Sequence, residues 1–349
     1  MKDYGKFNAG IIGPKSGVSG IARFNDSGTV RHFNDAAIAS GGAFLVSELE
    51  KREPKIKEPL TSVTYARDVP VKVGGGWVEY VSAMNIDFGL TGGSQNGPVS
   101  APGANGSPIV QMNLEKDTFG AHVFSSILRV PFVDMQRQQI TGKSLDALLT
   151  DGVRLAYDKH MDANCYVGIT DYGTQGLVNN SNVTASYVAQ NAGATSREWE
   201  DKTADEILKD VNDAITAVWS AAQYDLSAIP NHILIPHEQF NHIASQKVSS
   251  AADKSILEFL LDNNIAKRNG QQLVIAGCPW CKGAGASSTD RMVVYCHHER
   301  FLALEELVSL SRTMTQPNVE ALAYDSVYMA NISQLELFYT QTIRYFDGI

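Results

Sequence analysis

The chain has few cysteines, no long apolar run and no excess of positive charge, and each absence excludes a class of protein. Four cysteines in 349 residues are too few for a disulfide scaffold and fit a reducing compartment. No apolar run reaches the roughly 18 residues of a membrane-spanning helix, and the N-terminus lacks the basic start and apolar core of a signal peptide. A formal net charge of -9 argues against a dedicated DNA or RNA binder.

What the chain does have is enough apolar residues for a core, 44% of the total. The strongest helical pattern lies in residues 144–168, where apolar residues recur at helical spacing: Leu145, Leu148, Leu149, Val153, Ala156 and Val167. Ser144 suits the N-cap position, and Gly168 suits the C-terminal end. The pattern predicts one helix of roughly 36 Å.

Residues 61–128 have the pattern of two strands around a glycine-rich centre. Residues 61–73 are β-branched and roughly alternating, and residues 109–129 are strand-like, with Val123, Ser125, Ile127 and Arg129 at alternate positions. Between the strands, residues 89–108 contain almost no large apolar side chains. Because a two-stranded ribbon is marginally stable alone and its edges invite pairing with another chain, this hairpin favours an oligomer contact over an ordinary surface loop.

Residues 201–310 alternate predicted helices and strands. Thr203 and Glu206 have the spacing of a capping box at the start of a helix, whose apolar stripe is Ile207, Val211, Ile215, Val218, Trp219 and Ala222. Short strands are expected at 232–235, 273–276 and 291–296, and further helices at 237–246 and 255–264. This order predicts a compact α/β unit, followed by strand-like sequence from 321 to 349.

The N-terminal segment allows two interpretations. Residues 1–42 are rich in Gly, Asn and Ser, which fits either a frayed terminus or an arm that orders against a neighbouring subunit. Residues 43–59 begin as an amphipathic helix that Pro54 would break.

The best candidate for chemistry is a possible zinc site. Cys278 and Cys281 are two residues apart, and with Cys296 and His298 they would supply four ligands for a tetrahedral zinc ion. Ordinary packing of these cysteines is the favoured alternative, because Cys296 lies in an apolar strand, where a free cysteine behaves as a small hydrophobic residue. His237 and His242 are five residues apart rather than the four that a zinc-protease helix needs. No catalytic residue, cofactor site or definite metal site is therefore expected, and the chain is not predicted to be an enzyme.

Several segments, taken in order, resemble the Hong Kong 97-type major capsid proteins of tailed phages. They are residues 63–71 and 77–80 for the outgoing hairpin strand, 88–90 near its tip, 130–138 and 159–168 at the two ends of the long helix, and 173–179 for a glycine-leucine-asparagine signature. Residues 283–295 and 344–349 are similar to a subgroup related to bacterial encapsulins. The resemblance covers nearly the whole chain, and its weight lies in the order of these short motifs.

This resemblance implies an α+β, Hong Kong 97-like capsid fold. Its parts would be an N-terminal arm (1–42), the start of the peripheral or P-domain (43–60), an extended hairpin loop (61–128), the rest of the P-domain (129–200) with the spine helix at 144–168, the axial or A-domain (201–310), and strands returning to the P-domain (311–349). About 42 residues before the body leave no room for a built-in scaffolding segment, so a separate scaffold, or none, is expected. Covalent cross-linking is not predicted, because nothing identifies a partner for Lys72 or Lys116.

The resemblance implies a structural protein of the virion, assembled in the host cytoplasm. Pentamers and hexamers of the chain would form an icosahedral phage head around double-stranded DNA without sequence-specific binding, together with a scaffolding protein, a portal and other head proteins. No cofactor and no membrane contact are expected. One alternative is the shell of an encapsulin-type bacterial compartment. A different class is a cytoplasmic zinc or thiol enzyme that uses Cys278, Cys281, Cys296 and His298.

Overall fold

The computed structural model describes residues 22–24, 30–32, 62–91, 109–141, 145–249 and 253–349. The chain divides into two compact units, residues 1–61 and 62–349. In the first unit, β1 (Ala22–Phe24) pairs antiparallel with β2 (Val30–His32). Most of the expected arm, the helix expected from residue 43 and the N-cap Ser144 lie outside the described residues, so these expectations stay predictions.

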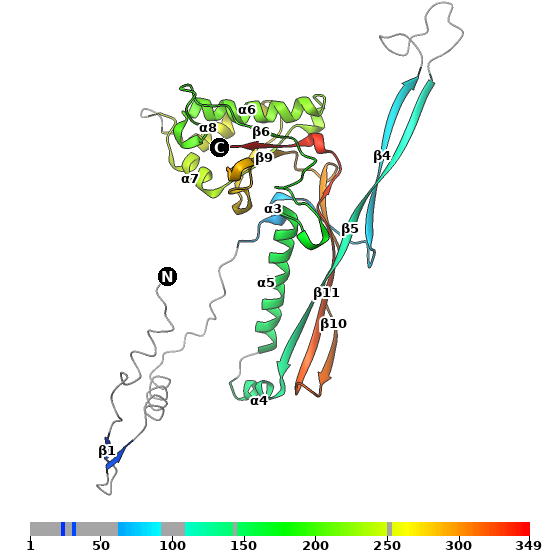
Figure 1. The fold of residues 1–349 in the computed structure, drawn as a ribbon, viewed down its shortest axis with the longest axis vertical. Helices are drawn as coiled ribbons and strands as arrows, with labels where there is room; N and C mark the ends of the chain where they lie inside the picture. Colours follow the sequence, from blue (N-terminus) through cyan, green and yellow to red (C-terminus); the bar gives the residue numbers. More distant parts are fainter. Residues whose placement is uncertain (1–21, 25–29, 33–61, 92–108, 142–144, 250–252) are drawn as a thin grey trace, which may run out of the picture. The chain divides into compact units, whose positions relative to one another are not determined.

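The second unit contains a long sheet with the strand order β12-β10-β11-β5-β4 (Figure 1). Its strands are β4 (Tyr80–Thr91), β5 (Ile109–Pro131), β10 (Leu302–Asn318), β11 (Ala323–Ser333) and β12 (Glu336–Leu337), and the short β3 (Val71–Val73) pairs with β10. Strand β5 changes partner near its middle: residues 109–120 pair with β4, and residues 121–131 pair with β11. The N-terminal half of β5 therefore forms a two-stranded ribbon, whereas its C-terminal half belongs to a wider sheet.

Helix α5 (Leu145–Tyr166) covers one face of the wider part of this sheet, and α4 (Phe132–Thr141) precedes it (Figure 1). Leu128 and Val130 of β5 and Tyr328 of β11 are buried there, and the partly buried Leu149 and Val153 of the helix pack against them. The Tyr157 hydroxyl donates to Glu306 Oε1 at 2.9 Å. The predicted long helix is thus confirmed.

A five-stranded sheet has the order β6-β13-β9-β7-β8. Its strands are β6 (Ala185–Tyr187), β7 (His232–Ile235), β8 (Val274–Gly277), β9 (Arg291–Tyr295) and β13 (Ile343–Asp347), and its helices are α6 (Ala204–Ala221), α7 (His237–Ser245), α8 (Ile256–Asp262) and α9 (Ile265–Arg268). The remaining elements are α3 (Tyr65–Asp68) and the 3-10 turns η1 (Thr170–Tyr172), η2 (Trp199–Asp201), η3 (Leu226–Ala228), η4 (Pro279–Cys281), η5 (Ala286–Ser288) and η6 (Thr340–Thr342). The capping box predicted at Thr203 and Glu206 is present, but the sheet also includes β6 and β13 from outside residues 201–310.

Both faces of the five-stranded sheet are buried. Along β7, Ile233 and Ile235 pack into the core that contains α6, whereas Leu234 packs into the core that contains the end of α5. Because neighbouring side chains of a strand point to opposite faces, this alternation shows that the sheet is covered on both sides. It also explains why the strands are continuous apolar runs.

Two expectations from the sequence are wrong. Residues 61–73 do not form one strand, because α3 occupies residues 65–68 and only β3 is extended. Asp162 of α5 explains the helical turn: its Oδ1 accepts hydrogen bonds from the backbone nitrogens of Thr64 and Tyr65 at 2.8 and 3.1 Å.

The C-terminal strands of residues 311–349 also do not stay together. Strands β10 and β11 belong to the long sheet, but β13 pairs with β9 in the five-stranded sheet. The physical reason is burial: Ile343, Tyr345 and Phe346 are nearly inaccessible there. Tyr345 also donates from its hydroxyl to Leu177 O at 2.8 Å.

Candidate functional site

The ribbon, which consists of β4 and residues 109–120 of β5, has one apolar face. Directly opposed residues of an antiparallel pair lie on the same face, and Ile86 is opposite Leu114 while Phe88 is opposite Met112. The members of this face are Met84, Ile86, Phe88, Val110, Met112 and Leu114, and each side chain is between 54% and 75% exposed. We call this set the apolar ribbon face.

The other face of the ribbon is polar. Asn85 is opposite Glu115 and donates from its side-chain amide to Asp117, and the Asn113 amide contacts Glu115 Oε1 at 3.4 Å. Strand β4 pairs with no second strand among the described residues. Because a two-stranded ribbon cannot cover its own face, the apolar ribbon face needs a partner to leave water.

A second exposed apolar region lies on the face of the long sheet opposite α5. Ile127 of β5 and Met314 of β10 are both in register with Val327 of β11, and Val123, Ile127 and Met314 are 50–62% exposed. Beside them, Arg129 Nε is 2.7 Å from Asp325 Oδ1. The alternation noticed in the sequence at 123, 125, 127 and 129 therefore marks the exposed face, and the intervening residues face α5.

Asp68, the last residue of α3, joins three segments that are distant in sequence. Its buried carboxylate accepts from Arg67 Nε and Nη2 at 2.6 and 2.8 Å and from the Tyr166 hydroxyl, and its backbone oxygen accepts from the Tyr295 hydroxyl at 2.6 Å. Burial alone would raise the pKa of Asp68, but the hydrogen bonds from Arg67 and Tyr166, together with the His232 imidazole 3.7 Å from Oδ1, outweigh burial and lower it. Burial and the nearby Asp68 charge raise the pKa of Tyr166, so its hydroxyl remains a donor.

The glycine-leucine-asparagine stretch, residues 173–179, forms hydrogen bonds to the chain just after the end of α5. Gly168 has φ +81°, and a side chain at Gly176 would meet the Tyr166 backbone carbon at 2.3 Å, so neither position accepts a larger residue without a backbone shift. Asn179 accepts from Gly176 N at 2.7 Å and donates to Val167 O at 2.8 Å. These contacts give a structural role to residues that were noticed only through resemblance.

The structure separates the four candidate zinc ligands into different environments. Cys278 and Cys281 are buried in the core that contains the end of α5, whereas Cys296 lies in a separate small core and directs its thiol to Ser227 O at 3.7 Å. His298 is exposed, and its Nδ1 accepts from Arg300 N at 3.1 Å. Within the described ranges, no group of three or more His, Cys, Asp or Glu side chains is placed to hold a metal ion.

The thiols also lack an activating environment. A hydrogen bond with Cys278 and burial raise the pKa of Cys281, and burial raises the pKa of Cys296 to about 12. A thiol must lose its proton to act as a nucleophile or a metal ligand. The surroundings therefore favour the packing interpretation of these cysteines.

Sequence reasoning missed the two buried carboxylates around α3. Asp162 is the second buried carboxylate there, and besides capping α3 it accepts from Trp280 Nε1 at 2.8 Å. Nothing local marks Asp68 or Asp162, because their partners lie up to 227 residues away in the chain. The apolar ribbon face, in contrast, has a readable signal in the period-two pattern at Met84, Ile86 and Phe88.

Comparison with known proteins identifies a family and a fold. A family model described as major capsid protein matches residues 100–349. The capsid of Myoviridae phage XM1 has a TM-score of 0.71 at 15% identity and covers 87% of this chain and 98% of its own. The capsid of the native GTA particle has a TM-score of 0.59 at 10% identity (89% and 98% covered), and Microbacterium phage Oxtober96 has 0.57 at 12% (87% and 98%). No curated protein matches the sequence.

These likenesses confirm the predicted α+β, Hong Kong 97-like capsid fold. They extend over most of the chain and nearly the full length of the solved structures. In the described part of the chain, no helix combines the length and the apolar character that crossing a membrane requires.

Proposed function

Because the chain belongs to the major capsid protein family, we propose that its copies assemble through pentamers and hexamers into an icosahedral head that encloses double-stranded DNA. In this proposal the chain is a structural component of the virion, is assembled in the host cytoplasm and carries no catalytic activity. Helix α5 would be the spine of the peripheral domain, and the five-stranded sheet with α6 would form the axial domain.

The single observation that carries this proposal is the apolar ribbon face. Burying a large apolar side chain contributes roughly 1.5–3 kcal/mol, so the exposed side chains of this face together represent on the order of 10 kcal/mol. That is comparable with the estimated cost of about 4–15 kcal/mol for associating two proteins. In a head, the ribbon of one subunit would bury this face on a neighbour, and head-to-tail contacts of that kind close into rings when the rotation permits.

The other partners follow from the same proposal. A separate scaffolding protein, a portal and further head proteins would complete the particle, and DNA would be enclosed without sequence-specific binding. The net charge of -9 is compatible with enclosing DNA that is not held tightly. An encapsulin-type compartment would use the same fold with protein cargo, but the family match and the phage capsid structures favour a head.

The first experiment expresses the chain alone and examines it by negative-stain electron microscopy and size-exclusion chromatography. Rings of five or six subunits, or closed shells, are expected. The ratio of absorbance at 260 and 280 nm then distinguishes shells filled with nucleic acid from shells filled with protein. A chain that stays monomeric at high concentration, both alone and with a crowding agent, contradicts the proposal.

A matched pair of variants tests the ribbon itself. Phe88→Asp adds a charge to the apolar ribbon face, and Asn113→Asp adds the same charge to the polar face. We expect the first variant to lose assembly and the second to retain it, with both subunits folded by circular dichroism. Equal assembly of the two variants would show that the apolar ribbon face is not the contact.

A further inference from the structure

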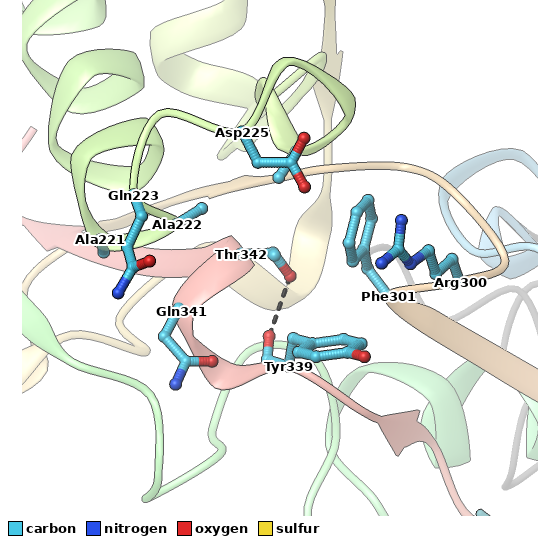
Figure 2. Close-up of a pocket in the computed structure, with 10 residues that line it drawn as sticks. Ala221, Ala222, Gln223, Asp225, Arg300, Phe301, Tyr339, Gln341 and Thr342 are labelled. Atoms are coloured by element: carbon cyan, nitrogen blue, oxygen red, sulfur yellow. Dashed lines mark hydrogen bonds between the residues drawn. The ribbon is translucent and has the colours of Figure 1, made fainter. Parts of the chain in front are cut away.

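A cavity of about 430 Å³ lies where the end of α6, the start of β10 and η6 meet. Its lining includes Gln223, Asp225, Arg300, Phe301 and Tyr339. Figure 2 shows the amide of Gln223 on the side of the cavity opposite Arg300 and Phe301. The Phe301 and Tyr339 rings contact each other edge to face, with a distance of 5.8 Å between the ring centroids. The cavity therefore has an aromatic wall and a polar rim.

The loop beside this cavity is held in a fixed shape. Gln223 and Tyr224 both have positive φ, 54° and 58°, which residues with side chains rarely adopt. Trp219 fixes this turn, because its Nε1 donates to Asp225 O at 2.9 Å and its backbone oxygen accepts from Tyr224 N at 2.9 Å. Strained backbone persists where the surrounding structure holds it, and it is concentrated at functional sites.

This fixed loop presents apolar side chains to solvent. Tyr224 is 57% exposed and Leu226 is 68% exposed, and Tyr339 on the cavity wall is 40% exposed. A rigid loop loses little conformational entropy when it binds. The loop with its exposed Tyr224 and Leu226 side chains and the cavity therefore lie next to each other on the surface.

The same area carries two opposite charges without an ion pair. Asp225 uses Oδ1 to accept from Ser227 N at 2.9 Å, and this backbone hydrogen bond lowers the pKa of Asp225, so its carboxylate is charged. The Arg300 guanidinium lies 5.6 Å from the centroid of the Phe301 ring. Among the described residues, neither side chain forms a salt bridge, although both line the cavity.

We propose that this area is a contact between two copies of the chain, in which Leu226 of each copy enters the cavity of the other and Asp225 of each faces Arg300 of the other. The inference rests on the proposed function and adds a specific contact to it. A second copy is the occupant that fits, because protrusion, cavity, negative charge and positive charge all lie on one patch. Such a patch is complementary to itself under a two-fold rotation.

The test reverses one charge at a time. Asp225→Arg produces a copy with two positive residues at the contact, and Arg300→Asp produces a copy with two negative residues. We expect each variant alone to assemble at least tenfold less than the wild type, by light scattering and electron microscopy. An equimolar mixture should assemble again into particles that contain both variants, because every contact between unlike copies is then matched.

The mixture distinguishes a lost contact from misfolding as the reason why a single variant fails to assemble. A variant that is misfolded stays misfolded when it is mixed with the other variant. Leu226→Ser provides a second measurement, because an exposed side chain can be shortened with the subunit intact; we expect it also to reduce assembly tenfold. The matched controls are Lys209→Asp and Asp213→Arg, at exposed positions of α6 outside the cavity lining, which should assemble as the wild type does.

The outcomes distinguish this inference from the proposed function. If the wild type forms shells and Leu226→Ser or either single charge reversal assembles equally well, the contact is wrong and the capsid function stands. If the mixed variants fail to assemble while each is folded, the reciprocal pairing is wrong. A wild-type chain that never assembles contradicts the proposed function and, with it, this inference.

Discussion

The two sheets of residues 62–349 differ in how completely they are covered. The five-stranded sheet has a core on each face, so every residue of β7 and β9 is buried. The long sheet has α5 on one face only, and its ribbon part has no covering layer among the described elements. The cores on both faces of the first sheet come from this chain, whereas the second sheet has an apolar surface that none of the described elements covers.

This difference separates stability from assembly. Substitutions in the five-stranded sheet should act on the free energy of unfolding of the subunit, because they remove contacts that exist before assembly. Substitutions on the apolar ribbon face should leave that free energy almost unchanged and act on association instead. The predictions below test this separation.

The largest effect is expected from shortening the ribbon. Deletion of residues 89–108 shortens the hairpin. Residues 92–108 lie outside the described part of the chain, and residues 89–91 belong to neither of the two large buried cores. We expect a folded subunit whose assembly is abolished. Circular dichroism measures whether the variant is folded, and electron microscopy measures whether it assembles. Global unfolding of the deletion variant would refute the prediction.

A matched pair of alanine substitutions compares the two sheets directly. Leu234 is 0% exposed and Phe88 is 68% exposed. Leu234→Ala should lower the free energy of unfolding by about 2–5 kcal/mol, and Phe88→Ala should change it by less than about 0.5 kcal/mol. Urea denaturation of unassembled subunits measures both values, and similar losses in the two variants would remove the distinction between the sheets.

The sequence predicted the parts of the fold that depend on local periodicity. The long helix, the capping box at Thr203 and the strand at 232–235 are present, because each follows from spacing within a few residues. The strand expected at 61–73 is absent, since Asp162, about 100 residues further along the chain, caps a helical turn there. Tertiary contacts of this kind override local propensity.

The candidate site shows the same limit. The apolar ribbon face could be predicted from alternating residues such as Ile86 and Phe88, and the hairpin was expected to make an oligomer contact. The cavity near Arg300 could not be predicted, because Asp225, Arg300 and Tyr339 come from separate elements. Likewise, the motif around Cys278 suggested zinc by spacing, whereas its surroundings depend on the packing of α5.

A moderate effect is expected at the buried carboxylate of α3. Asp68→Asn keeps the size of the side chain but removes the charge that Arg67 and Tyr166 bind. We expect a loss of about 1.5–3 kcal/mol in the free energy of unfolding, because the buried Tyr166 hydroxyl loses its charged acceptor, whereas the Arg67 side chain is 46% exposed and can bond to water. Thermal or urea denaturation measures this loss. The exposed pair of Lys254 and Asp262 is a suitable control, and Asp262→Asn should have a much smaller effect.

The smallest effect is a dependence on pH at Glu336 of β12. Burial and the nearby Glu305 raise the pKa of Glu336 to about 7, although the nearby Ser333 hydroxyl and the charge of Lys72 oppose this shift. Because the folded-state pKa is higher than the unfolded-state value of about 4.5, the folded state holds the proton more tightly. The stabilisation is complete below about pH 4.5 and is lost as the pH rises through about 7.

The measurement is the free energy of unfolding at pH 5 and at pH 7.5. Between these values the wild type should lose about 2 kcal/mol more than Glu336→Gln, which cannot ionise. Lys72→Met removes the nearby positive charge and should enlarge the loss, since that charge favours the ionised carboxylate. If wild type and Glu336→Gln have the same pH profile, Glu336 is already ionised at pH 5, and the long sheet tolerates a buried charge at its β12 edge.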